Sequence, residues 1–313
     1  MLKQVIDLHE ILDSPGAMGE GVRQYLVECG APTESVRVTR VCSEKGATDF
    51  LHVFVAGKSG KRAGGSAPTL GIIGRLGGIG ARPEITGFVS DGDGALAATA
   101  AAAKLVGMAA RGDRLAGDVI VTTHLCPDAP TREHYPVPFM DSPISFEDTW
   151  AHEIDPAMDA VISIDTTKGN RVINVRGLAM SPTVKQGYIL RTSESVMDVL
   201  SRVTGRAPEV FALTQQDITP YGNGLHHLNS ILQPAVATDA PVIGLALATE
   251  TTVAGCATGA SHEVDIEQAA RFAVEIAKDF TAGVCHFFDT DEYARLIELY
   301  GEQSRFQHGG ARQ

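Results

Sequence analysis

Two aspartates in a glycine-rich turn, Asp91 and Asp93 of the stretch SDGDG, are the first residues whose types suggest chemistry. The glycines permit a tight turn, and the alanine-rich run that follows predicts a narrow helix able to lie close to a sheet. Carboxylates fixed at the start of a buried helix suit a metal ion or a catalytic acid. The alternative is that they only cap the helix, where aspartate is favoured by the helix dipole.

Three further polar residues each follow directly on an apolar run: His124 after DVIVTT, Asp165 after AVISI and Glu250 after VIGLALAT. Because parallel strands end at the same edge of an open α/β sheet, where ligands bind, we expect these residues to share one edge with Asp91. Each also has a structural alternative. His124 would then be a hydrogen-bonded core histidine, Asp165 a turn cap, and Glu250 a hydrogen-bonded turn residue.

His262, in the loop CATGASHE before the last long helical segment, completes a set of four candidate ligands. Asp91 and Asp165 would supply oxygen ligands, and His124 and His262 would supply nitrogen ligands. This mixture suits a divalent metal, zinc or manganese. The alternative for His262 is a cap at the start of the helix.

The elements that must position these residues alternate between apolar runs and helical patterns. The fold class is therefore predicted as α/β, with a mixed, mostly parallel sheet flanked by helices and strands buried on both faces. A hairpin is predicted over residues 169–177. The predicted central strands are TLGIIG, GDVIVTTH, DAVISID and PVIGLALATE, and the main predicted helices cover residues 2–29 with a break at 13–16, 95–105, 194–202 and 264–280.

The connection between the second and third of these strands is long and rich in proline and charge. We expect residues 128–152 to form a lid over the site. His226, in a glycine-rich loop, is a candidate substrate contact, or else a surface residue. The chain is predicted as one domain over residues 1–302, followed by a frayed polar tail over 303–313.

Composition limits the classes of partner. The formal net charge of −12 argues against nucleic acid and anionic membranes, and no apolar run is long enough to span a bilayer. The charged N-terminal stretch lacks the apolar core of a signal peptide. Five cysteines without a C-x-x-C pair fit reduced thiols, so a cytoplasmic location is expected.

Several stretches together resemble the glutamyl-aminopeptidase and tetrahedral-aminopeptidase group of co-catalytic zinc peptidases. They are ILDSPGAMGEGVRQYL, TLGIIGRLGGIG, SDGDGALAA, AVISIDTT and the course from PVIGLAL to SHEVDIEQAARFAVEI. The chain is also similar to an uncharacterised bacterial protein family of unknown function. The peptidase resemblance implies a zinc-exopeptidase-like three-layer fold, Asp91 as the metal-bridging aspartate, Asp165 as a further ligand, and assembly into homo-oligomers.

The chain departs from the peptidase pattern at its catalytic positions. Arg75 stands where that family has its first histidine ligand, and His124 stands in place of a Glu-Glu pair that supplies a base and a ligand. The resemblance makes Glu133 of the predicted lid the candidate catalytic base in place of that pair. A guanidinium has no lone pair for a metal and repels a nearby cation. The resemblance and Arg75 together predict at most one tightly bound metal. Arg75 would then pair with Asp91 or with a carboxylate of the substrate.

The sequence therefore predicts a metal-assisted hydrolase of small peptides or related amides, with a carboxylate-bearing substrate. The partner expected is a small molecule or peptide, together with further copies of the chain. The alternative from another class is a non-catalytic relative that binds a small ligand or acts in assembly. A third interpretation, metal-free chemistry at Cys126 with His124, lacks a sequence signal for a lowered thiol pKa.

Overall fold

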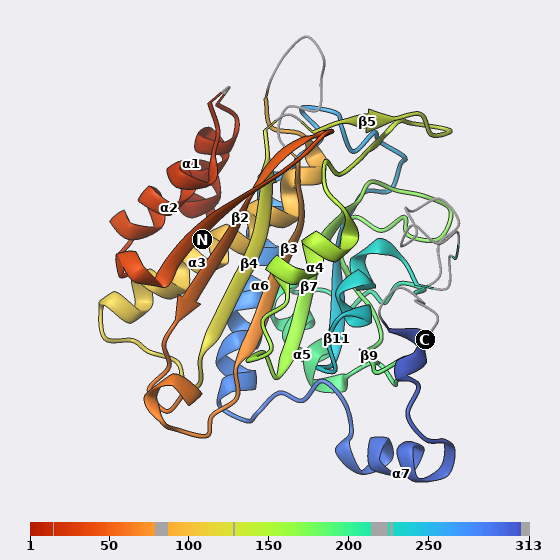
Figure 1. Cartoon of the computed structure of the whole chain (residues 1–313). Coiled ribbons are helices and arrows are strands. Elements are labelled where there is room, and N and C mark those ends of the chain that lie inside the picture. Colours follow the sequence, from red (N-terminus) through yellow and green to blue (C-terminus); the bar gives the residue numbers. More distant parts are fainter. Residues whose placement is uncertain (15, 79–86, 128, 214–224, 226–227, 308–313) are drawn as a thin grey trace.

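The computed structural model describes the chain except residues 15, 79–86, 128, 214–224, 226–227 and 308–313. Its centre is a nine-stranded sheet in which four neighbouring strands run parallel (Figure 1). In order across the sheet they are β4 (Val119–Cys126), β3 (Leu70–Gly78), β7 (Ala160–Thr167) and β11 (Val242–Ala248). These are the four apolar runs, so the predicted mixed, mostly parallel sheet is confirmed.

Antiparallel strands extend the sheet on both sides. The hairpin of β1 and β2 pairs with β4, and short strands continue the sheet beyond β11. The hairpin predicted over residues 169–177 does not form, because residues 168–176 run as an irregular connection into β8. The bounds are β1 (Val36–Ser43), β2 (Gly46–Val55), β8 (Gly177–Met180), β9 (Val184–Lys185) and β10 (Tyr188–Ile189).

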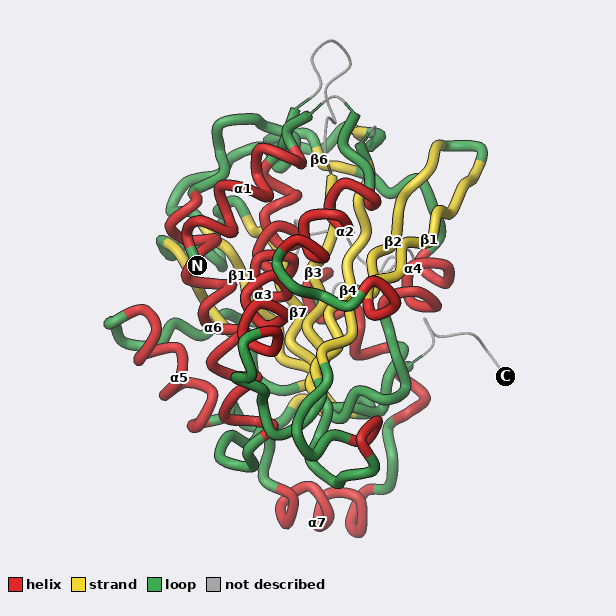
Figure 2. The backbone as a smooth tube through the Cα atoms, turned by 90° about the vertical axis from the view of Figure 1, so that its left-hand side faces the viewer, coloured by secondary structure: helices red, strands yellow, loops and turns green. Residues whose placement is uncertain are grey.

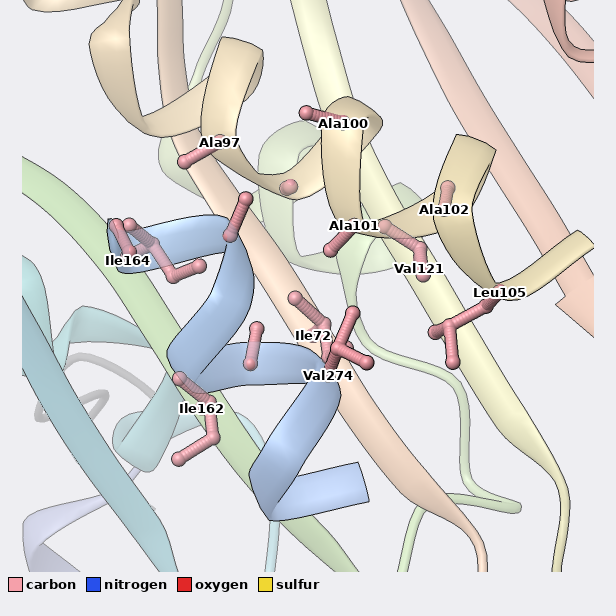
Figure 3. Close-up of a cluster of buried hydrophobic side chains, with 14 of the residues drawn as sticks. Ile72, Ala97, Ala100, Ala101, Ala102, Leu105, Val121, Ile162, Ile164 and Val274 are labelled. Atoms are coloured by element: carbon pink, nitrogen blue, oxygen red, sulfur yellow. The ribbon is translucent and has the colours of Figure 1, made fainter. Parts of the chain in front are cut away.

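Most of the helices cover one face of the sheet (Figure 2). They are α1 (Leu2–Leu12), α2 (Gly19–Glu28), α3 (Asp93–Ala110), α5 (Glu194–Thr204) and α6 (Glu263–Thr281). The alanine-rich α3 is buried along almost its whole length. It packs with α6 over β3, β4 and β7, where Ile72, Val121 and Ile162 meet the alanines (Figure 3).

Two glycines allow α3 to approach the sheet this closely. A Cβ on Gly94 would lie 2.5 Å from the carbonyl oxygen of Ile164 and 3.0 Å from that of Arg75. A Cβ on Gly74 of β3 would lie 2.6 Å from the carbonyl oxygen of Gly94. The start of α3, and the aspartates beside it, are therefore held directly against the ends of β3 and β7.

Shorter elements lie over the opposite face and across the carboxyl ends of the parallel strands (Figure 1). They are β5 (Thr131–Arg132), β6 (Phe139–Met140), α4 (Phe146–Glu153) and η4 (Ser230–Val236). Helix α4 crosses in front of the strands in Figure 1. Its N-cap is Ser145, whose hydroxyl accepts a hydrogen bond from the amide of Asp148, which is the capping pattern S-x-x-D.

The remaining elements lie at the periphery. Helix α7 (Thr290–Tyr300) buries none of its residues and projects from the end of the molecule (Figure 1). The segment predicted as a frayed tail has structure at its start, where Gln307 donates a hydrogen bond to the carbonyl of Thr238. Within the described residues no helix is long and apolar enough to cross a membrane. Single-turn helices are η1 (Thr33–Ser35), η2 (Lys61–Ala63), η3 (Ser90–Gly92) and η5 (Ser304–Phe306).

Candidate functional site

Three polar residues form a row across the centre of the sheet. Gly74 of β3 pairs in register with Thr123 of β4 and Ile164 of β7. The next residue on each strand is Arg75, His124 or Asp165, and Arg75 stands where the pairing of β3 with β4 shifts by one residue before Gly77. The three therefore follow directly on paired positions near the carboxyl ends of the parallel strands. All three are buried, with exposed fractions of 2–3%. The expectation that His124 and Asp165 share this edge is met, with Arg75 between them.

Arg75 is engaged by the elements that cover the row. Its guanidinium donates one hydrogen bond to Glu153 Oε2 of α4 and another to Gln233 Oε1 of η4. Glu153 has an exposed fraction of 0%, so this is a fully buried ion pair. The sequence predicted Asp91 or a substrate carboxylate as the partner of Arg75. The structure corrects this to Glu153, which α4 brings over the strand.

The tautomer of His124 follows from its neighbour Thr48. The Thr48 hydroxyl donates its single proton to the carbonyl of Leu125 at 3.0 Å, so it must accept from His124 Nδ1, which lies 3.1 Å away. The lone pair is therefore on Nε2, 3.9 Å from Glu153 Oε1. Burial, with the charge of Arg75, lowers the pKa of His124 to about 3. His124 is thus a neutral imidazole facing the Arg75–Glu153 pair.

Asp91 and Asp165 line one cavity of about 90 Å³ beside this row. Asp91 lies in η3, where its amide donates to the carbonyl of Gly255 at 2.9 Å. A Cβ on Gly255 would overlap the Asp91 carboxylate, so a larger residue at this position would displace that side chain. Asp165 accepts from the amide of Thr166 at 2.8 Å and from the hydroxyl of Ser230 on η4.

The two carboxylates repel each other. Burial and the charge of Asp165 raise the pKa of Asp91 to about 7. Burial also raises the pKa of Asp165 to about 6, against the opposing effect of Arg75. Neither carboxylate forms an ion pair with any residue that the structure describes. Two adjacent acidic groups without an ion-pair partner form a site that a divalent cation would stabilise.

A buried lysine stands at the rim of the same cavity. Lys168, three residues after Asp165, lines the cavity, and its Nζ donates to Asp93 Oδ2 at 2.8 Å and to the carbonyl of Ala260 at 3.0 Å. Asp93 also accepts from the hydroxyl of Ser261. Asp93 therefore holds Lys168, and it makes no capping hydrogen bond with a described residue at the start of α3.

The four predicted metal ligands are not brought together. Asp91 and Asp165 share the cavity, but His124 faces Glu153 and Arg75, and His262 is an exposed residue at the start of α6. Over the described part of the chain, no group of three or more histidine, cysteine or acidic side chains could hold a metal ion. His124 is enclosed with Arg75 and Glu153, and His262 lies in a separate groove with Glu250, so neither histidine lines the cavity of Asp91 and Asp165.

The segment predicted as a lid lies over the cavity, with a different residue facing it. Glu133 is exposed and does not line the cavity, whereas the adjacent His134 does. His134 Nδ1 lies 3.2 Å from the carbonyl of Val137 and its ring stacks on Phe139. A neutral His134 therefore carries its proton on Nδ1 and keeps a lone pair on Nε2. The candidate substrate contact His226 lies outside the described residues.

Sequence reasoning missed Glu153, Gln233, Lys168 and His134. For Glu153 a signal existed, because the S-x-x-D pattern at Ser145 marks the start of a helix that Glu153 ends. For Lys168 the signal was its position just after the strand that carries Asp165. Gln233 offered none, because only folding brings it to Arg75, 158 positions away.

The raised pKa of Asp91 predicts how stability depends on pH. Between the ordinary value of 3.8 and about 7 the folded protein binds more protons than the unfolded chain, so the contribution of Asp91 to stability falls as pH rises through this window. We expect Asp91→Asn to raise the free energy of unfolding at pH 8 and to raise it less at pH 5, measured by urea denaturation with a chelator present.

As a control, the same substitution at Asp289 should change the free energy of unfolding in the opposite direction. Hydrogen bonds from the backbone amides of Glu292 and Asp291 hold the pKa of Asp289 below its ordinary value. Asp289→Asn should therefore lower stability at pH 8. An Asp91→Asn variant that is less stable than the unchanged protein at pH 8 would contradict the prediction.

Comparisons with known proteins agree with this architecture. A search of curated proteins found no match. Among solved structures, the fold is similar to that of the leucine aminopeptidase of Caenorhabditis elegans, with a TM-score of 0.50 and 11% identity over 91% of this chain. This chain spans 65% of the length of that aminopeptidase. Residues 39–310 match the family described as "Protein of unknown function (DUF1177)", and the chain belongs to that family.

Proposed function

We propose that this protein is a metal-assisted hydrolase of small peptides or related amides, acting at the Asp91–Asp165 cavity. One observation carries the proposal: two adjacent carboxylates, without a cationic partner among the described residues, line a cavity at the carboxyl edge of parallel strands. The peptidase-like fold supports it. A divalent cation held there would polarise the scissile carbonyl and lower the pKa of a bound water.

The donor atoms favour one type of cation. Asp91 and Asp165 offer carboxylate oxygens, and neither His124 nor His262 lines the cavity, so the donor atoms suit manganese better than zinc. A second cation beside His124 would meet the buried Arg75 guanidinium, and close repulsion in a site of low dielectric disfavours it. We therefore propose a single cation per chain.

His134 is the proposed proton acceptor. It lines the cavity on the segment over the site, and Phe139 and the carbonyl of Val137 fix the orientation of its ring. Its Nε2 lone pair is the group that would accept a proton from water. Glu133, the base expected from the sequence, is exposed and does not line the cavity, so we assign it no role there.

The test combines metal binding with turnover. Equilibrium dialysis should give one Mn²⁺ per unchanged chain and a large loss of binding in Asp91→Asn and Asp165→Asn. His134→Gln should bind Mn²⁺ normally but hydrolyse alanylalanine roughly 100-fold more slowly, with Glu133→Gln as the matched control that leaves both measurements unchanged. Hydrolysis that survives loss of both carboxylates would overturn the proposal. Binding of Mn²⁺ without hydrolysis would favour the ligand-binding alternative.

A further inference from the structure

Lys168 keeps one proton for a ligand. Its exposed fraction is 8%, and its ammonium group has three protons, of which two are donated to Asp93 and to the carbonyl of Ala260. No third acceptor lies within hydrogen-bond distance among the residues that the structure describes. Because Lys168 lines the cavity, the remaining proton is available to an acceptor bound there.

The neighbouring Thr167 supplies a second, independent observation. Thr167 also lines the cavity, has an exposed fraction of 5%, and its Oγ1 finds no hydrogen-bond partner in the described part of the chain. Burying a hydroxyl without a partner costs free energy, so Thr167 would gain from a hydrogen bond to a bound group. A ligand carboxylate has two oxygen atoms, so it would offer one acceptor to each residue.

Arg75 is not available for this task. Two of its nitrogens donate to Glu153 and Gln233, and although its Nε has no hydrogen-bond partner among the described residues, Arg75 is not among the residues that line the cavity. The carboxylate recognition that the sequence assigned to Arg75 therefore needs another cation, and Lys168 is the one beside Asp91 and Asp165.

We propose that Lys168 and Thr167 bind a carboxylate of the substrate, so that the site takes small amides bearing a free carboxylate near the bond that is cleaved. This deepens the proposed function and rests on it. The cavity of about 90 Å³ is far smaller than the roughly 300–1,000 Å³ of sites for drug-sized ligands. It therefore accommodates the carboxylate end of a short peptide or an acylated amino acid, with the rest of the substrate outside.

The charges of the cavity make this binding dependent on a cation. Asp93 already balances Lys168, and the carboxylates of Asp91 and Asp165 repel an incoming anion. A divalent cation at the two carboxylates removes that repulsion. Carboxylate binding should therefore be stronger with Mn²⁺ than with a chelator.

The experiment compares two probes that differ only in charge, N-acetylalanine and its C-terminal amide, by calorimetry with Mn²⁺ and with a chelator. In Mn²⁺ the unchanged protein should bind the free acid at least about tenfold more tightly than the amide. A hydrogen bond to a charged group is strong enough to change the dissociation constant by that factor. Equal binding of the two probes, or no binding of either, would overturn the proposal.

Variants separate recognition from folding. Lys168→Met should abolish the preference for the acid, and the double variant Lys168→Met/Asp93→Asn should do the same while leaving no unpaired Asp93 charge. Lys185→Met is the matched control, because Lys185 lies outside the cavity and bonds the carbonyl of Asp239. A preference for the acid that persists in the double variant would overturn the assignment.

The Thr167→Val variant distinguishes a role of the hydroxyl in binding from a role in stability. It should weaken binding of the acid severalfold without lowering the urea midpoint, since the hydroxyl makes no hydrogen bond with a described residue. A loss of stability with unchanged binding would contradict the assignment. Binding and turnover are separate readouts, so a preference for the acid without hydrolysis would leave the Lys168 site standing and overturn the proposed reaction.

Discussion

Replacing Glu153 with alanine is expected to lower the free energy of unfolding by roughly 3–5 kcal/mol, because it leaves a buried guanidinium without its counter-charge. Arg75 has an exposed fraction of 3% and its partner one of 0%, so water cannot replace the lost carboxylate. Urea denaturation near pH 8 measures the change. At this pH the Glu153 carboxyl, whose pKa burial raises to about 7, is mostly ionised.

Two controls separate the charge from the packing. Glu147→Ala removes an exposed carboxylate from the same helix and should change stability by less than about 1 kcal/mol. The double variant Arg75→Met/Glu153→Leu removes both charges and should regain most of the loss, since apolar replacement of a buried ion pair is often neutral. A double variant as unstable as Glu153→Ala would show that the ion pair itself is not the cause.

The second large effect is expected from Gly94→Ala. The new Cβ would lie 2.5 Å from the carbonyl oxygen of Ile164 and 3.0 Å from that of Arg75. Both atoms belong to the backbone of central strands, so they cannot rotate away as a side chain would. Because α3 must shift outward, we expect a loss of about 1–3 kcal/mol or more, together with weaker binding of Mn²⁺ as Asp91 moves.

Gly107→Ala is the matched control in the same helix. Its Cβ would approach no atom closer than 3.4 Å, at the carbonyl oxygen of Cys29. Alanine also favours the helical conformation over glycine by about 1 kcal/mol, so this variant should be neutral or more stable. If both substitutions give the same urea midpoint, the close approach of α3 to the sheet does not limit stability.

Much of the framework could be predicted from local pattern. The four apolar runs became the four parallel strands because a strand buried on both faces needs apolar residues on both of its sides. The turn before α3 and the polar residues at strand ends could be predicted from local pattern as well. The shared position of Asp91 and Asp165 in one cavity could therefore be predicted from the sequence.

The partners of the charged residues could not be predicted in the same way. Arg75 was expected at the end of its strand, yet Glu153 reaches it from 78 positions away and Gln233 from 158. His124 lies at the end of a strand, as predicted, but it faces the Arg75–Glu153 ion pair and does not line the cavity. Burial near other charges, rather than residue type, decided which groups face the cavity.

By itself the sequence determined the fold class, the strands at the centre and the two carboxylates at their edge, because periodicity and strand ends are local properties of the chain. Only the tertiary structure decided that Arg75 is neutralised by α4, that His134 rather than Glu133 lines the cavity, and that Lys168 brings a positive charge to it. These outcomes depend on which side chains from distant segments are buried against one another, and the packing of the layers decides this.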